Sequence, residues 1–328
     1  MANLLITNHC PRQCTFCFAR TKIGRDKNQQ TADKMSLDQV RRIMDFLERS
    51  DEKSLRLLGG EPTTHPQLKE IVSEAIERGF HVYLFSNCMM SKATADFLAS
   101  LPRQQLSILV NVSPQARDSQ KQKEQVAYAL SRLGERAQLG ITLTSPDFEY
   151  EFLFEYIDKY ALRRHIRIGI AQPIVGTANE YLAPSEYRET GRSITKMAKV
   201  CFERDILIGF DCGLTLCMFS EEEIGILAKR SEGFKAVCKP IIDIGPNFDI
   251  WHCFPLSEVL NTRLENFATR NEAHRFYQEL TMPYRSFGCL PQCSQCDYLR
   301  RGQCTGGCLA HAMNSLDRLP PKVIEQKS

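Results

Sequence analysis

Fourteen cysteines in a chain of 328 residues constrain this protein more than any other feature of its sequence. Three of them lie between Cys10 and Cys17, and nine lie between Cys212 and Cys308. The N-terminus lacks a secretory signal pattern, and no segment approaches the ~20 apolar residues that cross a bilayer. A chain of this length buries enough core to fold without disulfides. We therefore expect a cytoplasmic protein whose reduced, clustered cysteines bind metal.

The bulk composition narrows the classes of partner. Hydrophobic residues make up 43% of the chain and charged residues 25%, which is ordinary for a globular protein and excludes disordered, collagen-like and coiled-coil chains. The net charge is only +3, so bulk electrostatics give no support for binding nucleic acid or an anionic membrane. We expect neither among the partners.

Short apolar runs alternate with amphipathic helical patterns in the first two thirds of the chain. The runs are Asn3–Asn8, Ser54–Leu58, His81–Ser86, Leu106–Val112, Gln138–Thr144 and His165–Ala171. Continuous apolar runs of this kind are typical of parallel strands covered by helices. The fold class predicted is α/β: a partial barrel of six βα units over residues 1–205, two units short of a closed TIM barrel.

The pattern changes after residue 205. Residues 206–319 are turn-rich and cysteine-rich, with a β-hairpin expected within Ile241–Trp251 and a helix near Asn271–Leu280. A region with so little periodic core is expected to gain order from metal–thiolate bonds. We predict a small cysteine-rich domain over 206–319 and a polar tail over 320–328.

The first strand leads into Cys10-x3-Cys14-x2-Cys17, with Phe16 inside the last gap. Three thiolates at the carboxyl end of a barrel strand lie where such folds place their chemistry, and three ligands leave one iron of a 4Fe–4S cluster open. The alternative is a structural zinc site with His9 as the fourth ligand. The second predicted strand ends in Gly59-Gly60-Glu61-Pro62, a turn that lets backbone approach a ligand closely.

The cysteine triplet and the Gly-Gly-Glu-Pro segment resemble the radical S-adenosylmethionine (radical SAM) superfamily. The resemblance implies that Cys10, Cys14 and Cys17 hold a 4Fe–4S cluster whose open iron binds S-adenosylmethionine (SAM). One electron from an external low-potential donor then cleaves SAM, and the resulting 5′-deoxyadenosyl radical abstracts a hydrogen from the substrate.

The resemblance also implies a set of SAM contacts. Gly59, Gly60 and Glu61 would bind the methionine amino group, and Phe16 would lie beside adenine. Asn111 and Ser113, and with less support Asn87, would contact the ribose, the carboxylate or the substrate. For each of these three polar residues the alternative is an ordinary role in capping a strand end and starting a turn.

The later cysteines resemble the SPASM or twitch extension of radical SAM enzymes, which holds one or two auxiliary 4Fe–4S clusters. The expected ligands are Cys212, Cys217, Cys238, Cys253, Cys293, Cys296, Cys304 and Cys308. By resemblance, Cys253 and Cys308 would share a cluster with Cys238. The match is imperfect, because seven residues instead of five separate Cys296 from Cys304 and no cysteine follows Cys308. Cys289, Cys212 or Cys217 would replace the missing ligand, and two zinc ribbons are the alternative.

The resemblance predicts a radical SAM oxidoreductase or maturase that oxidises or cross-links a peptide or protein side chain. One alternative is a twitch-type dehydrogenase or cyclase acting on a small molecule. An alternative of another class is a non-catalytic cysteine-rich metal-binding or redox protein. Because the first strand begins at Asn3, we expect no recognition module fused before the barrel, so a separate protein would present a peptide substrate.

Overall fold

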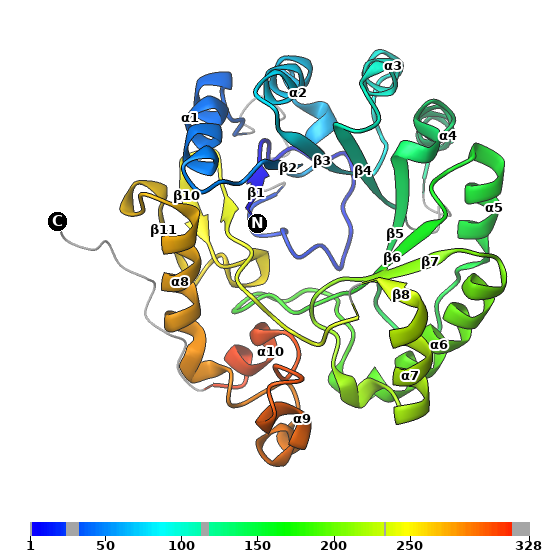
Figure 1. The fold of residues 1–328 in the computed structure, drawn as a ribbon, viewed down its shortest axis with the longest axis vertical. Coiled ribbons are helices and arrows are strands. Elements are labelled where there is room, and N and C mark those ends of the chain that lie inside the picture. Colours follow the sequence, from blue (N-terminus) through cyan, green and yellow to red (C-terminus); the bar gives the residue numbers. More distant parts are fainter. Residues whose placement is uncertain (1, 24–32, 113–117, 233, 317–328) are drawn as a thin grey trace.

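The computed structural model describes residues 2–23, 33–112, 118–232 and 234–316. Its centre is one curved sheet in the order β11-β10-β9-β1-β2-β3-β4-β5-β6-β7-β8, and neighbouring strands from β9 through β1 to β8 are parallel (Figure 1). These strands are β1 (Asn3–Leu5), β2 (Ser54–Leu58), β3 (His81–Ser86), β4 (Leu106–Asn111), β5 (Ala137–Leu143), β6 (His165–Ile170), β7 (Leu207–Phe210), β8 (Ser231–Glu232) and β9 (Asp243–Ile244). The α/β class and the parallel barrel-like sheet are confirmed.

Helices cover the outer face of the sheet (Figure 1). They are α1 (Leu37–Glu48), α2 (Leu68–Glu77), α3 (Lys92–Ser100), α4 (Gln120–Leu133), α5 (Glu151–Tyr160), α6 (Tyr187–Glu203) and α7 (Glu221–Arg230). Alternate strand residues such as Leu55 and Leu57 are fully buried against them, while Arg56 between these two is half-buried on the inner face. Side chains along each strand thus point alternately into the core beneath the helices and toward the inside of the barrel.

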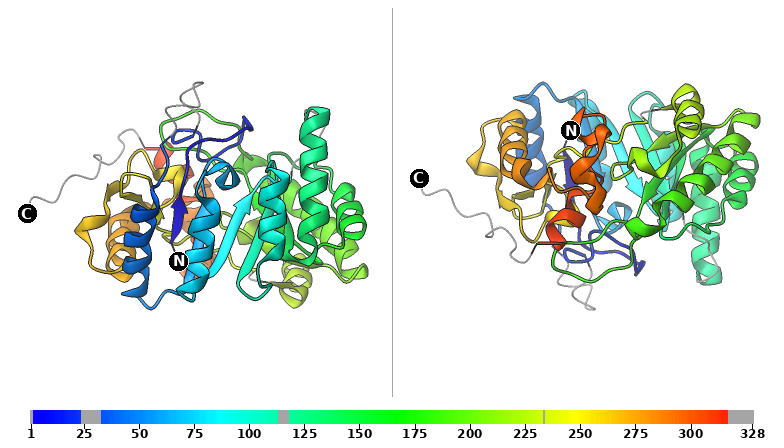
Figure 2. Two further views of the ribbon diagram at one scale, coloured as in Figure 1. Left: turned by 90° about the horizontal axis from the view of Figure 1, so that it is seen from above. Right: turned by 90° about the horizontal axis from the view of Figure 1, so that it is seen from below.

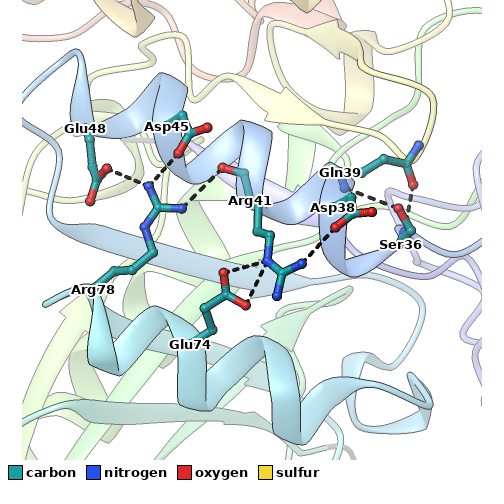
Figure 3. A network of polar contacts seen from close by, with 8 residues as sticks. All are labelled: Ser36, Asp38, Gln39, Arg41, Asp45, Glu48, Glu74 and Arg78. Carbon is teal, nitrogen blue, oxygen red and sulfur yellow. Dashed lines mark hydrogen bonds and ion pairs between the residues drawn. The ribbon is translucent and has the colours of Figure 1, made fainter.

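Local signals fix the helix starts. Ser36 and Gln39 form the capping box that the sequence predicts for α1, each side chain bonding to the other's backbone N–H. On the outer surface, Arg41 of α1 bonds Glu74 of α2 at 2.8 Å, and Arg78 bonds Asp45 and Glu48 of α1 at 2.6 Å (Figure 3). These pairs lie at the solvent-exposed surface, so each contributes little to stability.

The sheet continues on both sides of the six predicted strands. β7 and β8 extend it beyond residue 205, and β9 pairs in parallel with β1 at its other edge. The predicted hairpin forms from β9 and β10 (Asp249–Trp251), followed by β11 (Asn261–Arg263). The expected helix is α8 (Arg270–Thr281). The division at residue 205 falls within this continuous sheet and stays a prediction about domains.

The C-terminal segment lies between the two ends of the open sheet. Its helices α9 (Asp297–Arg300) and α10 (Leu309–Asn314) sit between α8 on one side and α6 and α7 on the other (Figures 1 and 2). Cys304 forms a β-bridge with Ala236, and His311 lies 3.2 Å from the hydroxyl of Tyr187 in α6. Among the described residues, no helix has the length and apolar character needed to span a bilayer.

Candidate active site

The cysteine triplet lies on the loop that follows β1, and the end of β2 is fastened to this loop. Gly60 N–H donates to the carbonyl of Thr7 at 2.8 Å, and Glu61 N–H donates to that of His9 at 2.7 Å. A Cβ on Gly59 would lie 2.4 Å from the Thr7 oxygen, and one on Gly60 would lie 2.1 Å from the His9 oxygen. Both glycines are therefore required by the close approach of two backbone segments.

The Glu61 side chain is buried and accepts four hydrogen bonds. Its Oε1 receives Thr63 Oγ1–H at 2.6 Å, Thr63 N–H at 3.1 Å and Ser86 Oγ–H at 2.8 Å, and its Oε2 receives Asn87 N–H at 2.7 Å. Burial raises the pKa of Glu61, and these hydrogen bonds oppose the shift. The carboxylate thus joins the end of β2 to the end of β3 directly beneath the cysteine loop.

The three thiols of the triplet are half-buried on one loop. Burial raises the pKa of Cys10 to about 12, and the nearby Glu61, Cys17 and Cys14 add to that shift. Burial also raises the pKa of Cys14 and of Cys17. The amide Nδ2 of Asn87 lies 3.7 Å from Cys10 Sγ. Thiols whose charged form is so disfavoured need a positive partner to become thiolates, and iron supplies one.

Two later loops contact the triplet loop. Arg12, inside the first cysteine gap, pairs with Asp118 at 2.6 Å, and both side chains are almost buried. Thr15 donates to the carboxylate of Glu180 in the loop after β6, and Glu180 N–H returns to the Thr15 carbonyl at 3.2 Å. Sequence reasoning did not identify Arg12, Asp118 or Glu180. The only local signal was the position of Arg12 between two cysteines.

The remaining predicted SAM contacts are less defined. Phe16 is half-buried on the triplet loop, and Asn111 is exposed at the end of β4. Ser113 lies outside the described residues. The side chain of Asn87 reaches Cys10 of the triplet, while its backbone N–H donates to Glu61.

The later cysteines form two groups. The first contains Cys212, Cys238, Cys253 and Cys308: the Cys238 thiol adds to the rise in the pKa of each of the other three, so these thiols lie close together. The surrounding protein raises the pKa of Cys212 to about 12 and that of Cys253 well above the usual value. Cys212 nevertheless keeps an exposed surface and Cys253 is half-buried. Cys253 also packs against the hydrophobic core.

The second group lies where the loop after β7 meets the C-terminal segment. Burial raises the pKa of Cys217, and the thiols of Cys304, Cys293 and Cys296 contribute to the shift. Cys289 lies near the same thiols. Burial raises its pKa, and Cys293, Cys217 and Cys304 add to that shift.

Glycines allow this crowding. A Cβ on Gly288 would lie 2.6 Å from Cys293 Sγ, and one on Gly307 would lie 2.9 Å from Cys289 Sγ. Gly306 N–H donates to Cys304 Sγ at 3.3 Å. All three glycines have φ between +64° and +82°, which L side chains rarely adopt.

No three His, Cys, Asp or Glu side chains in the described part of the chain are arranged to hold a metal ion. The ligands of a 4Fe–4S cluster each bind a different iron, so they stand farther apart than the ligands of one ion. The donor set fits such clusters in its chemistry: it consists of thiols collected in three groups, and glycines lie against Cys289 and Cys293 in the last of these groups.

Parts of the chain are similar in sequence to a family model and to curated proteins. Residues 4–124 match the family model of the Radical SAM superfamily. The chain is 29% identical over 87 residues (26% of this chain, 22% of the relative) to PqqA peptide cyclase from Rhodopseudomonas palustris. It is 30% identical over 112 residues (33% and 21%) to 7,8-dihydro-6-hydroxymethylpterin dimethyltransferase from Methanocaldococcus jannaschii. The matched segments span about a fifth of the length of these curated relatives.

Among solved structures, native anSMEcpe with bound AdoMet is similar in fold. The TM-score is 0.68 at 14% identity, and the alignment covers 98% of this chain and 93% of the other. The shared fold therefore extends well beyond the segment matched by the family model. Residues 4–124, which contain the cysteine triplet and the Gly-Gly-Glu-Pro segment, are similar to the Radical SAM superfamily.

Proposed function

We propose that this chain is a radical SAM enzyme that cleaves SAM reductively and removes a hydrogen from its substrate. The observation that carries the proposal is the fastening of Gly60 and Glu61 to Thr7 and His9, which holds the end of β2 against the cysteine triplet. Bound SAM and a 4Fe–4S cluster on Cys10, Cys14 and Cys17 would supply the radical chemistry. The protein itself would orient SAM and exclude water.

Each residue would have a separate task. The three thiolates would hold three irons, and the backbone of Gly59 and Gly60 would meet the methionine amino group. Glu61 would keep both strand ends in place through its four hydrogen bonds. Asn87 Nδ2, 3.7 Å from Cys10 Sγ, would donate to that thiolate. Phe16, Asn111 and Ser113 keep the SAM contacts predicted from the sequence.

The decisive experiment is anaerobic reconstitution with iron and sulfide, followed by reduction and assay for 5′-deoxyadenosine. We expect cleavage by the wild type and none by Cys10→Ala, Cys14→Ala or Cys17→Ala. Cys201→Ala is a matched control, because this buried thiol lies in α6 and packs in the hydrophobic core. Undiminished cleavage in all three triplet variants would refute the radical SAM proposal.

We also infer two auxiliary 4Fe–4S clusters, which would define a cysteine-rich domain over 206–319. One would use Cys212, Cys238, Cys253 and Cys308, and the other would use Cys217, Cys293, Cys296 and Cys304. Support comes from the proximity of the thiols: Cys238 raises the pKa of Cys212, Cys253 and Cys308, and Cys304, Cys293 and Cys296 raise that of Cys217. The triple variant of Cys10, Cys14 and Cys17 should then retain about eight irons with sulfide and cleave no SAM. Zinc without sulfide in that variant would contradict the clusters.

A peptide or protein is the substrate we propose. PqqA peptide cyclase is named for a peptide, and anSMEcpe has been solved with bound AdoMet and the Cp18Cys peptide. The reaction would be an oxidation or cross-link of a side chain, with an external low-potential electron donor, a separate recognition protein and a cytoplasmic setting. The pterin named in the second curated relative favours a small molecule as the other candidate. Incubating the cleaving enzyme with candidate peptides and pterins, and measuring product mass, separates the two.

A further inference from the structure

A cavity of about 250 Å³ lies inside the curve of the sheet, away from the cysteine triplet. Its walls include Arg56 of β2, Tyr83 of β3, Gln138 of β5 and Arg167 of β6. These residues alternate along their strands with buried side chains such as Leu55, Val82 and Leu139, which pack beneath the helices. The cavity is therefore built on the inner faces of the barrel strands.

Arg56 is the central group of this cavity. Its guanidinium lies 4.7 Å from the centre of the Tyr83 ring. Its Nε is buried without a hydrogen-bond partner, and its guanidinium forms no ion pair with the described residues. Burial lowers the pKa of Arg56. A partly buried guanidinium normally pairs with a carboxylate or phosphate through its planar fork of N–H donors, so Arg56 has donors to offer.

The other charges around the cavity leave it cationic. Arg167 is neutralised by an ion pair with Asp211. Arg136 and Arg163 also line the cavity and form no ion pair with a described carboxylate, although Arg136 Nη2 donates to the Leu101 carbonyl at 2.7 Å. Glu232 is the acidic lining residue, and it lies 3.5 Å from His165 with its side chain largely exposed. The arginines thus outnumber the carboxylates that face the same space.

We propose that this cavity binds a carboxylate of the substrate, with Arg56 as its principal ligand. The inference deepens the proposed function and rests on it, because it assigns the substrate an acidic group. Arg56 lies in β2 three residues before Gly59, which directly follows the strand, so the bound carboxylate would lie about 10 Å from the glycines that approach the triplet loop. An extended substrate anchored by its carboxylate would thus present its other end to the proposed SAM site.

The test measures anion binding and not turnover. Reconstituted full-length protein is titrated by calorimetry with glutarate, with its uncharged diamide and with inorganic phosphate. We expect glutarate to bind and the diamide not to bind. Arg56→Gln should raise the Kd for glutarate about tenfold or more, as expected for the loss of a charge-assisted hydrogen bond, and Arg56→Lys should recover part of the affinity.

Arg103→Gln is the matched control, because it removes the same charge from an exposed arginine that pairs with Glu135 outside the cavity. Equal affinity in Arg56→Gln and Arg103→Gln overturns the proposal, as does absence of glutarate binding or stronger binding of phosphate. In wild-type protein, glutarate should also shift the Nε–H NMR signal of Arg56, which keeps the test valid if Arg56→Gln fails to fold. SAM cleavage without glutarate binding rejects this site alone, and glutarate binding without SAM cleavage rejects the proposed function alone.

Discussion

Replacing Glu61 with glutamine tests whether this residue acts as a clamp between strands or as a direct ligand. Its Oε2 accepts one hydrogen bond, from Asn87 N–H, and its Oε1 accepts three. The glutamine NH2 would occupy the less crowded position and face the Asn87 N–H as donor against donor. One charge-assisted bond, worth about 1.5–3 kcal/mol, is then lost.

Two further effects act on the same substitution. The three bonds to Oε1 weaken because their acceptor becomes neutral, which adds to the loss. Removing a buried charge, whose cost is evident from the raised pKa of Glu61, offsets part of it. We expect Glu61→Gln to lower the free energy of unfolding by about 2 kcal/mol.

The assay is urea unfolding at neutral pH, followed by far-UV circular dichroism. Glu135→Gln is the control, because Glu135 pairs with Arg103 at 2.7 Å while both side chains are more than 60% exposed. That variant should lose about 1 kcal/mol or less. If Glu61 instead receives the SAM ammonium, Glu61→Gln would be as stable as the control and would bind SAM about ten- to a hundredfold more weakly. That pair of results would refute the clamp.

Three more substitutions test separate parts of the structure. Gly60→Ala places a Cβ 2.1 Å from a backbone oxygen of the cysteine loop and should abolish loading of the triplet cluster. Gly225→Ala is the control, because open space surrounds Gly225, and this variant should bind iron normally. Equal iron content in the two variants would contradict the close approach of Gly60 to the cysteine loop. In the triple variant of Cys10, Cys14 and Cys17, adding Cys217→Ser should remove about four irons, whereas adding Cys289→Ser should remove none. The reverse result would show that Cys289, and not Cys217, is the cluster ligand. His65 accepts from Gln67 N–H and donates to the Met35 carbonyl, and burial lowers its pKa. A lowered histidine pKa stabilises the fold fully above pH 6.5 and progressively less as the pH falls, so His65→Gln should make unfolding less sensitive to pH between 7.5 and 5. An unchanged pH profile would show that His65 does not titrate as inferred.

Much of the barrel follows from local sequence patterns. Continuous apolar runs predicted all six strands β1 to β6, and β2 and β3 begin and end where those runs do. Capping residues such as Ser36 predicted where helices start. These features are local, because strand and helix formation depend on periodicity and on caps within a few residues. The cysteine triplet and Gly59-Gly60 were recognisable for the same reason: their spacing is short and specific.

The tertiary structure decided what depends on residues far apart in the chain. β9 covers the free edge of β1 from more than 200 residues away, and no local pattern specifies that pairing. Cys212 and Cys217 are close in sequence, yet the turn between them directs their thiols to different groups of cysteines. Glu61 and Arg56 carry similar local signals as charged residues of β2 and its end. Their neighbours differ: Glu61 accepts from Ser86 and Asn87 at the end of β3, whereas Arg56 lines a cavity and its Nε has no hydrogen-bond partner among the described residues.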